Sequence, residues 1–164
     1  MAKRIFRNIV LTAILTVLLA AAVIVPSLYT AHENRMSSAL RQEAGIIADA
    51  LELAEDDPAY LKQLDTESRI SLISADGTVL FDSVADAAQM ENHANRPEFV
   101  QALESGSGES TRASETLAKT TIYYALRMEN GLVLRISDTR SSMLGTFMKV
   151  LPMIVGMLLC VVLI

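Results

Sequence analysis

Two basic side chains in the stretch 91–98 could take part in chemistry. Imidazole titrates near neutral pH and binds metals, so His93, beside Glu91 and Asn92, could sense pH or hold a metal ion. A guanidinium group can grip a carboxylate with two hydrogen bonds, so Arg96 could bind a small acid. Arg96 also stands where a helix is expected to begin, and the free N–H groups at a helix N-terminus favour anions.

Each of these side chains also has a purely structural interpretation. His93 could hydrogen-bond the backbone ahead of the helix, and His32, the second histidine of the chain, is 61 positions away, which makes a metal site improbable. Arg96 could form a salt bridge within its own domain. We therefore expect no metal site. For Arg96 we favour the salt bridge, with binding of a small acid as the functional alternative.

The chain contains no recognisable pattern for catalysis. Neither G-x-S-x-G nor H-E-x-x-H occurs. The single cysteine, Cys160, excludes an intrachain disulfide and a cysteine-based zinc site. The acidic run 49–57 lacks the spacing of a calcium loop and is expected to be a solvated face. We predict neither a catalytic residue nor a cofactor in this chain.

Charge is distributed very unevenly along the chain. All 19 Asp and Glu residues lie between Glu33 and Asp138, and residues 30–142 carry only 10 Lys and Arg. The resulting balance of -9 repels phosphate, so a nucleic-acid partner is not expected. Both ends, in contrast, are apolar.

The N-terminal apolar segment, residues 9–29, predicts a first transmembrane helix. Its 20 residues from Ile9 to Leu28 carry no charge, enough to cross about 30 Å of hydrocarbon. Lys3, Arg4 and Arg7 precede it, so the positive-inside rule places residues 1–8 in the cytoplasm and residues 30–142 outside. A cleavable signal peptide is the alternative interpretation.

Residues 143–164 predict a second transmembrane helix that returns the chain to the cytoplasm. Lys149 lies inside this segment, where its amine can reach the headgroups. Alternatively, the membrane stretch begins only at Val150. Since no basic residues follow the apolar run, we expect the chain to continue into a cytoplasmic region, with a C-terminal anchor as the competing idea.

The region between the spans begins with a helical pattern. Apolar residues recur at three-, four- and seven-residue steps from residue 30 to residue 54. The stripe consists of Met36, Leu40, Ala44, Ile47, Leu51 and Ala54. It could cover the sheet of its own domain or form a parallel dimer seam, and both interpretations stay open. Pro58 ends the pattern.

The rest of the region predicts a second helix and five strands. Asp76-Gly77 joins two short strand patterns, and Asn130-Gly131 joins two more, both typical of hairpins. The helix between them is expected to begin at Asn95 as N-cap, with Glu98 completing a capping box, and to end at the turn 105–108. In the strand 121–128, Ile122 and Tyr124 share one face. The polar stretch 109–118 fits an edge strand. The fold class is therefore α+β, a five-stranded antiparallel sheet with helices on its apolar face.

Three stretches of this region resemble a known family: RISLISADGTVLFDS, MENHANRPEFVQAL and TTIYYALRMENGLVLRIS. Together with the two-span layout they resemble the extracytoplasmic sensor region of bacterial membrane histidine kinases, in particular the phosphate-regulon sensor kinase group. That region is a single Cache, or PAS-like, domain. The likeness covers about residues 69–137, and its most specific features are D-G-T-V-L-x-D-S and N-H-x-x-R-P-E.

The resemblance implies strand order 2-1-5-4-3, a long N-terminal helix and a homodimer. It also implies a cytoplasmic region outside this chain, with a phosphoacceptor histidine, an ATP-binding domain and a response regulator as partner. His32 and His93 lie outside the membrane on this topology, so neither is the phosphoacceptor, and the chain alone should have no kinase activity. Related domains bind small acids at an Arg-Pro segment, which implies that Tyr123, Tyr124 and Arg127 line one pocket with His93 and Arg96.

We therefore expect the signal-input region of a two-component sensor histidine kinase, located in the plasma membrane with its sensor domain outside. A small acid or a protein would supply the stimulus. Two alternatives remain: the sensor region of a chemotaxis receptor or cyclic-dinucleotide enzyme, and a stand-alone membrane-anchored interaction protein.

Overall fold

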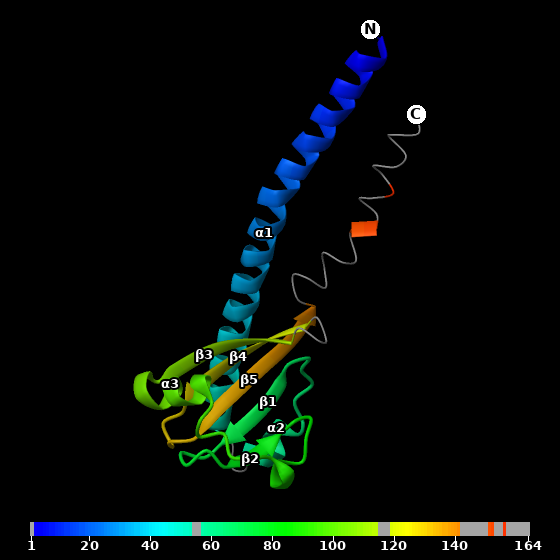
Figure 1. Cartoon of the computed structure of the whole chain (residues 1–164). Helices are drawn as coiled ribbons and strands as arrows, with labels where there is room; N and C mark the ends of the chain where they lie inside the picture. The colour runs from blue at the N-terminus through cyan, green and yellow to red at the C-terminus, as the bar shows by residue number, and fades with distance from the viewer. Residues whose placement is uncertain (1, 54–56, 115–118, 142–150, 153–155, 157–164) are drawn as a thin grey trace. The chain divides into compact units, whose positions relative to one another are not determined.

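The computed structural model of the chain describes residues 2–53, 57–114, 119–141, 151–152 and 156. Figure 1 shows the elements in their order along the chain. They are α1 (Ala2–Leu51), α2 (Asp57–Leu61), β1 (Arg69–Ile73), β2 (Val79–Asp82), the 3-10 helix η1 (Ala87–Gln89), α3 (Pro97–Ser105), β3 (Ser107–Ser114), β4 (Lys119–Arg127) and β5 (Val133–Ser141).

The chain divides into two compact units. One consists of Met1–Arg35 and Ser141–Ile164, and the other is Met36–Arg140. Within the described residues, α1 is the one helix long and apolar enough to cross a membrane. The second predicted span, 143–164, lies outside the described residues except at positions 151, 152 and 156.

Helix α1 confirms the helix expected over residues 30–54 and extends it: the same helix includes the N-terminal apolar segment, with Pro26 inside it. Its apolar stripe packs on the sheet of its own domain. The buried core contains Leu40, Ala44, Ile47, Ala48 and Leu51 from α1 together with Ile70, Leu72, Ile122, Tyr124, Leu134 and Ile136 from the strands. Four residues of the proposed dimer seam, Leu40, Ala44, Ile47 and Leu51, are buried in this core, which favours the interpretation that the stripe covers the sheet of its own domain. The homodimer itself stays a prediction. The last position of the stripe, Ala54, lies outside the described residues.

The sheet has five strands in the order β2-β1-β5-β4-β3, as the resemblance implied. Strand β1 pairs antiparallel with both β2 and β5, and β3 pairs antiparallel with β4. Both expected hairpin turns are present, and Gly77 and Gly131 adopt φ values of 88° and 82° in them. These left-handed conformations suit glycine because it has no Cβ. Strand β3 is an edge strand, as expected, although it begins two residues earlier than the pattern suggested.

Both faces of the sheet are covered, which corrects the expectation of helices on a single face. Helix α1 covers one face, and α3 covers the other (Figure 1). A second, smaller core lies under α3 and consists of Ile73, Val79, Phe99, Ala102, Ala125 and Val133. The alternation along the strands therefore separates two buried faces, so a polar side chain opposite the α1 core points toward α3.

Helix α3 begins differently from the expected pattern. Its N-cap is Arg96, which makes no side-chain capping bond, and Pro97 occupies the first turn. Asn95 is therefore not the cap, and Glu98 makes no capping box, because its side chain turns toward the sheet instead. The helix ends at Gly106, whose φ of 88° closes it in the left-handed conformation. Glu98 is thereby fixed in the first turn of α3, facing β3 and β5.

Candidate functional site

A row of polar side chains crosses the α3 face of the sheet, one from each strand. We call this set the polar row; it consists of Asp82, Ser71, Arg135, Tyr123 and Ser110, in the spatial order β2, β1, β5, β4, β3. Ser71 lies directly opposite Asp82 on one side and Arg135 on the other. Ser110 lies opposite Tyr123, and the Arg135 guanidinium lies 5.5 Å from the centre of the Tyr123 ring. The row therefore connects all five strands beneath α3.

Glu98 of α3 lies over this row and is fully buried, with 0% of its surface exposed. Its Oε2 accepts hydrogen bonds from the Ser110 hydroxyl (2.6 Å) and from Nη2 of Arg112 (2.6 Å). Its Oε1 accepts a second bond from Arg112 (2.9 Å) and lies 3.6 Å from Nη1 of Arg135. Burial alone would raise the pKa of Glu98. The bond from Ser110, the residue's own N–H and the two arginine charges outweigh burial and hold the pKa below its usual value.

The two arginines are also held by groups other than Glu98. The Arg112 guanidinium lies 4.4 Å from the centre of the Tyr123 ring, within the range of a cation–π contact. Nη2 of Arg135 donates to the Ser71 hydroxyl at 3.1 Å, and that hydroxyl donates to Asp82 at 2.8 Å. Burial lowers the pKa of Arg135, while the Glu98 charge opposes this effect. The guanidinium positions are thus set largely by the sheet.

Asp82 holds the outer end of the polar row. Nε of Arg69 donates to both carboxylate oxygens of Asp82, at 3.0 Å each. The N–H groups of Val84 and Ala85 donate to the same carboxylate. Burial would raise the pKa of Asp82, but these donors and Ser71 lower it below the usual value. Asp82 therefore stays charged and fastens the loop after β2 to the row.

His93 lies on the same face and is 4% exposed. Its backbone N–H donates to the Gly77 carbonyl (2.8 Å), and its carbonyl accepts from the Arg96 N–H (3.0 Å). Within the described part of the chain its Nδ1 is buried without a hydrogen-bond partner. The two backbone hydrogen bonds of His93 thus come from its main chain. Burial, followed by the charges of Arg135 and Arg96, lowers the pKa of His93 to about 4. The imidazole is therefore neutral at neutral pH.

Arg96 precedes α3 and is half-buried. The salt bridge that we favoured for it is not found: across residues 2–53, 57–114 and 119–141, its side chain has no ion pair. Its charge nevertheless acts on His93, as the lowered pKa shows. Arg96 is therefore a cation close to the buried side chain of His93.

The structure places the other two predicted site residues elsewhere. Tyr124 lies on the opposite face of the sheet, in the α1 core, with the Arg41 guanidinium 5.5 Å from its ring centre. Arg127 donates to the Leu103 carbonyl at the far end of α3. Thus His93, Arg96 and Tyr123 gather on the α3 face, whereas Tyr124 and Arg127 do not join them.

Sequence reasoning missed the residues that form the centre of the cluster, Glu98, Arg112 and Arg135. One signal was available for Arg135. It alternates with Leu134 and Ile136, so it had to face away from the α1 core. No comparable signal marked Arg112, because the strand SGESTRAS has no apolar alternation to define its faces.

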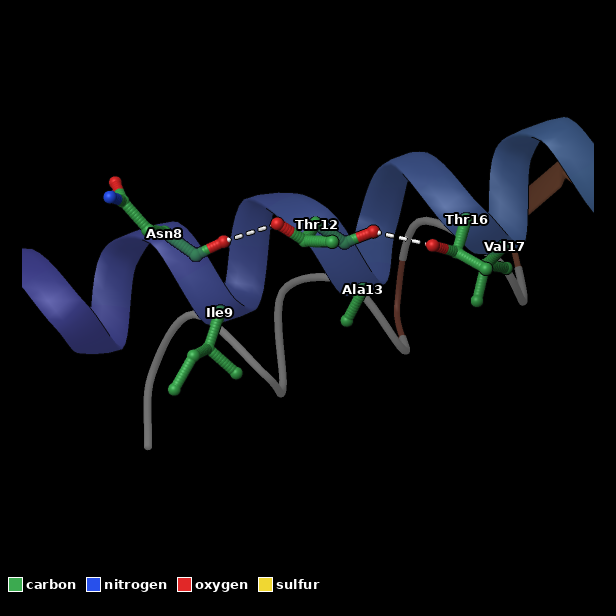
Figure 2. Close-up of a pocket in the computed structure, with 6 residues that line it drawn as sticks. All are labelled: Asn8, Ile9, Thr12, Ala13, Thr16 and Val17. Carbon is green, nitrogen blue, oxygen red and sulfur yellow. Dashed lines mark hydrogen bonds between the residues drawn. The ribbon is translucent and has the colours of Figure 1, made fainter.

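A separate hollow of about 610 Å³ lies along the first part of α1. Figure 2 shows the residues that line it, Asn8, Ile9, Thr12, Ala13, Thr16 and Val17. The Thr12 hydroxyl donates to the Asn8 carbonyl and the Thr16 hydroxyl to the Thr12 carbonyl, each at 2.8 Å. Their hydroxyl protons are used within the helix, so this hollow offers little for recognising a ligand. Among the described residues, no group of three or more His, Cys, Asp or Glu could hold a metal.

No protein-family model matches this sequence, and no curated protein does. Among solved structures, the chain is similar to the extracellular domain of a protein described as a histidine kinase, rpHK1S-Z16. That match has 25% identity, a TM-score of 0.39, and coverage of 51% of this chain and 36% of the other. It is also similar to the YkuI protein of Bacillus subtilis, which has an EAL domain and was crystallised with c-di-GMP and calcium. Here the identity is 14% and the TM-score 0.45, over 66% of this chain and 35% of the other. The chain thus spans about a third of each of these solved chains.

Proposed function

We propose that this chain is the signal-input region of a membrane-bound sensor histidine kinase, with residues 30–142 outside the cell. One observation carries the proposal: α1 is a single helix that includes both the charge-free segment Ile9–Leu28 and the residues Leu40–Leu51 that pack in the domain core. In this proposal, the continuity of the helix lets a change in the packing of the sensor domain act on the membrane segment. The resemblance in residues 69–137 and the strand order β2-β1-β5-β4-β3 support the same proposal.

Strand β5 is the proposed route of the signal out of the domain. It lies between β1 and β4 in the sheet and ends at Ser141, two residues before the predicted second span begins. Arg135 is the charged member of the polar row on this strand, and it contacts Glu98 and Ser71. A stimulus that moves α3 would change the contacts of Arg135 and would act on β5. The domain would then exist in two states, with α3 in its present position or moved. A stimulus can shift the equilibrium between them only by the difference in its affinity for the two states, typically about 1–3 kcal/mol.

The stimulus is proposed to act on the α3 face, where His93, Arg96 and Tyr123 lie. Arg96 is the favoured contact because it is only half-buried and, in the described part of the chain, has no ion pair. A small acid or an acidic segment of a protein has the chemistry to bind it. We also propose that the protein forms a homodimer and that its partner is a response regulator. The ATP-binding domain would lie in a cytoplasmic region of the parent protein.

The test is autophosphorylation of the full-length parent protein in membrane vesicles supplied with ATP. The wild type is compared with Arg135→Met, which removes the charge from β5, and with Arg41→Ala, which removes an exposed charge from the opposite face. We expect phosphorylation of a cytoplasmic histidine, changed about fivefold or more by Arg135→Met and little by Arg41→Ala. If the parent protein incorporates no phosphate from ATP, the proposal that it is a histidine kinase is contradicted. Synthesis or hydrolysis of a cyclic dinucleotide by the parent would favour the alternative receptor.

A further inference from the structure

We infer that Glu98 is an internal ligand: its carboxylate fills a carboxylate-binding site that Ser110, Arg112 and Arg135 form, and thereby closes this site to small external acids. The inference goes beyond the proposed function. It concerns the chemistry of the α3 face and holds whatever the output of the parent protein is. Three properties of the structure support it.

The donors around Glu98 match the shape and charge of a carboxylate. Each carboxylate oxygen has two of them: Oε2 receives Ser110 and Arg112, and Oε1 receives Arg112 and faces Arg135. Two guanidinium groups thus surround one carboxylate. Within the described residues Nε of Arg135 is buried without a partner, so Arg135 has a donor that neither Glu98 nor Ser71 uses. Such a set of donors is typical of the recognition of a carboxylate by arginine.

The site is held together without Glu98. Arg112 rests against the ring of Tyr123, and Arg135 is hydrogen-bonded to Ser71, which is itself bonded to Asp82. Tyr123 also lies 5.5 Å from the Arg135 guanidinium. If the Glu98 side chain were removed, these contacts would keep both guanidinium groups facing the same space. A buried ion pair whose arginines depended on the carboxylate alone would collapse or turn toward water.

The backbone of α3 keeps the internal carboxylate in place. Gly108 of β3 approaches α3 so closely that a Cβ at this position would overlap the Glu98 carbonyl oxygen. Gln101 of α3 also accepts a hydrogen bond from the Glu109 N–H of β3 (3.1 Å). Since Glu98 is tethered at the right place, its effective concentration at the site is very high. A small acid free in solution therefore cannot compete unless α3 moves away.

Chemical rescue by acetate tests the inference on the full chain in detergent micelles. The variants are Glu98→Ala, which empties the site, and Glu98→Gln, which fills it with a neutral group. Glu109→Ala serves as control, because it removes a carboxylate from β3 whose partner Arg41 is largely exposed. Thermal unfolding is followed by the near-ultraviolet circular dichroism of tyrosine at pH 7. Sodium acetate is compared with sodium chloride at equal ionic strength, and acetamide is the neutral analogue.

We expect acetate to raise the Tm of Glu98→Ala by roughly 5 °C when it is present at ten times its Kd. Acetate should leave the wild type, Glu98→Gln and Glu109→Ala unchanged, and acetamide should stabilise none of them. If Glu98→Ala does not fold in chloride, its refolding yield is measured in acetate and in chloride instead. We then expect the higher yield in acetate. An equal rise in the Tm of the wild type would show that acetate binds elsewhere. No rise for Glu98→Ala would show that the carboxylate-binding site does not persist once the Glu98 side chain is removed. Either result overturns the inference. Neither would bear on autophosphorylation by the parent protein, so the two proposals fail separately.

Discussion

Nη2 of Arg112 lies 2.6 Å from Oε2 and 2.9 Å from Oε1 of Glu98, so one nitrogen of an edge strand holds both oxygens of a buried carboxylate on α3. This contact fastens the polar strand β3 to the helix above it. On the other face of the sheet, Glu109 of the same strand accepts bonds from Ser37 and Arg41 of α1. Strand β3 is therefore held by charged groups on both sides, one buried and one exposed.

The buried contact should matter far more for stability than the exposed one. Glu98→Gln leaves Arg135 buried without its counter-ion, which we expect to lower the free energy of unfolding by about 3–5 kcal/mol. Glu109→Gln breaks a pair whose arginine is 63% exposed, and we expect a loss below about 1 kcal/mol. Urea unfolding of the full chain in micelles measures both values. Equal losses for the two variants would contradict the central place of Glu98.

The domain should lose stability in mild acid because of His93. Its pKa is about 4 in the folded chain, below the usual value of 6.5, so the unfolded chain binds the proton more readily. The stabilisation is fully present above pH 6.5 and is lost as the pH falls toward 4. Between pH 7 and pH 5 the expected loss is about 1–2 kcal/mol.

His93→Gln should flatten this pH dependence, and His32→Gln, which changes an exposed histidine, should leave it intact. The carboxyls of Asp82 and Glu98 also have lowered pKa values, but their contribution is lost only as the pH falls below their ordinary values of 3.8 and 4.5, outside the range from pH 7 to pH 5. Unfolding free energies of the three proteins at pH 7, 6 and 5 provide the measurement. A His93→Gln protein as acid-sensitive as the wild type would show that His93 is not the cause.

The two hairpin turns should differ in their tolerance of a side chain. Gly77 and Gly131 both have positive φ, so alanine at either site is strained by about 1–2 kcal/mol. At Gly77 a Cβ would also overlap the backbone nitrogen of Ala94, whereas at Gly131 nothing lies within 4 Å. We expect Gly77→Ala to lower the Tm clearly more than Gly131→Ala. Because Gly77 also accepts the N–H of His93, equal shifts would contradict the close approach of this turn to the polar cluster.

The buried stripe of α1 should contribute to folding of the single chain. Leu40 is buried against the sheet, and Leu40→Ala should cost about 2–5 kcal/mol. Ile46, which is 62% exposed on the same helix, should tolerate Ile46→Ala with less than about 1 kcal/mol. Both losses should be independent of protein concentration. A loss for Leu40→Ala that disappears on dilution would instead favour the dimer seam.

Most of the fold could be predicted from the sequence because its signals are local. Asp76-Gly77 and Asn130-Gly131 determine hairpins through the positive φ of glycine, and strict alternation around Ile122 and Ile136 defines strands. The helix stripe from Leu40 to Leu51 likewise follows from spacing. The surface that this stripe packs against could not be predicted. A stripe that packs on its own sheet has the same spacing as one that packs on a second chain.

The candidate site was predicted only in part, because its centre depends on contacts between distant elements. Glu98 lies three positions after Asn95, which matches a capping box, and only the tertiary structure shows that its carboxylate turns to Arg112 instead. The resemblance implied that Tyr123 and Tyr124 line one pocket, whereas the alternation along the strand puts these neighbours on opposite faces of the sheet. Conversely, Arg96 was expected to form an ion pair, and the described residues provide none.

Site-directed labelling tests the proposed orientation of the chain most directly. Cys160 is replaced by serine, and single cysteines are introduced by Val84→Cys, at a position 73% exposed in the sheet domain, and by Lys3→Cys, near the start of α1. A maleimide that does not cross the cytoplasmic membrane is then applied to intact and to lysed cells. We expect Val84→Cys to react in intact cells and Lys3→Cys to react only after lysis. Reaction of Val84→Cys only after lysis would contradict the proposed orientation.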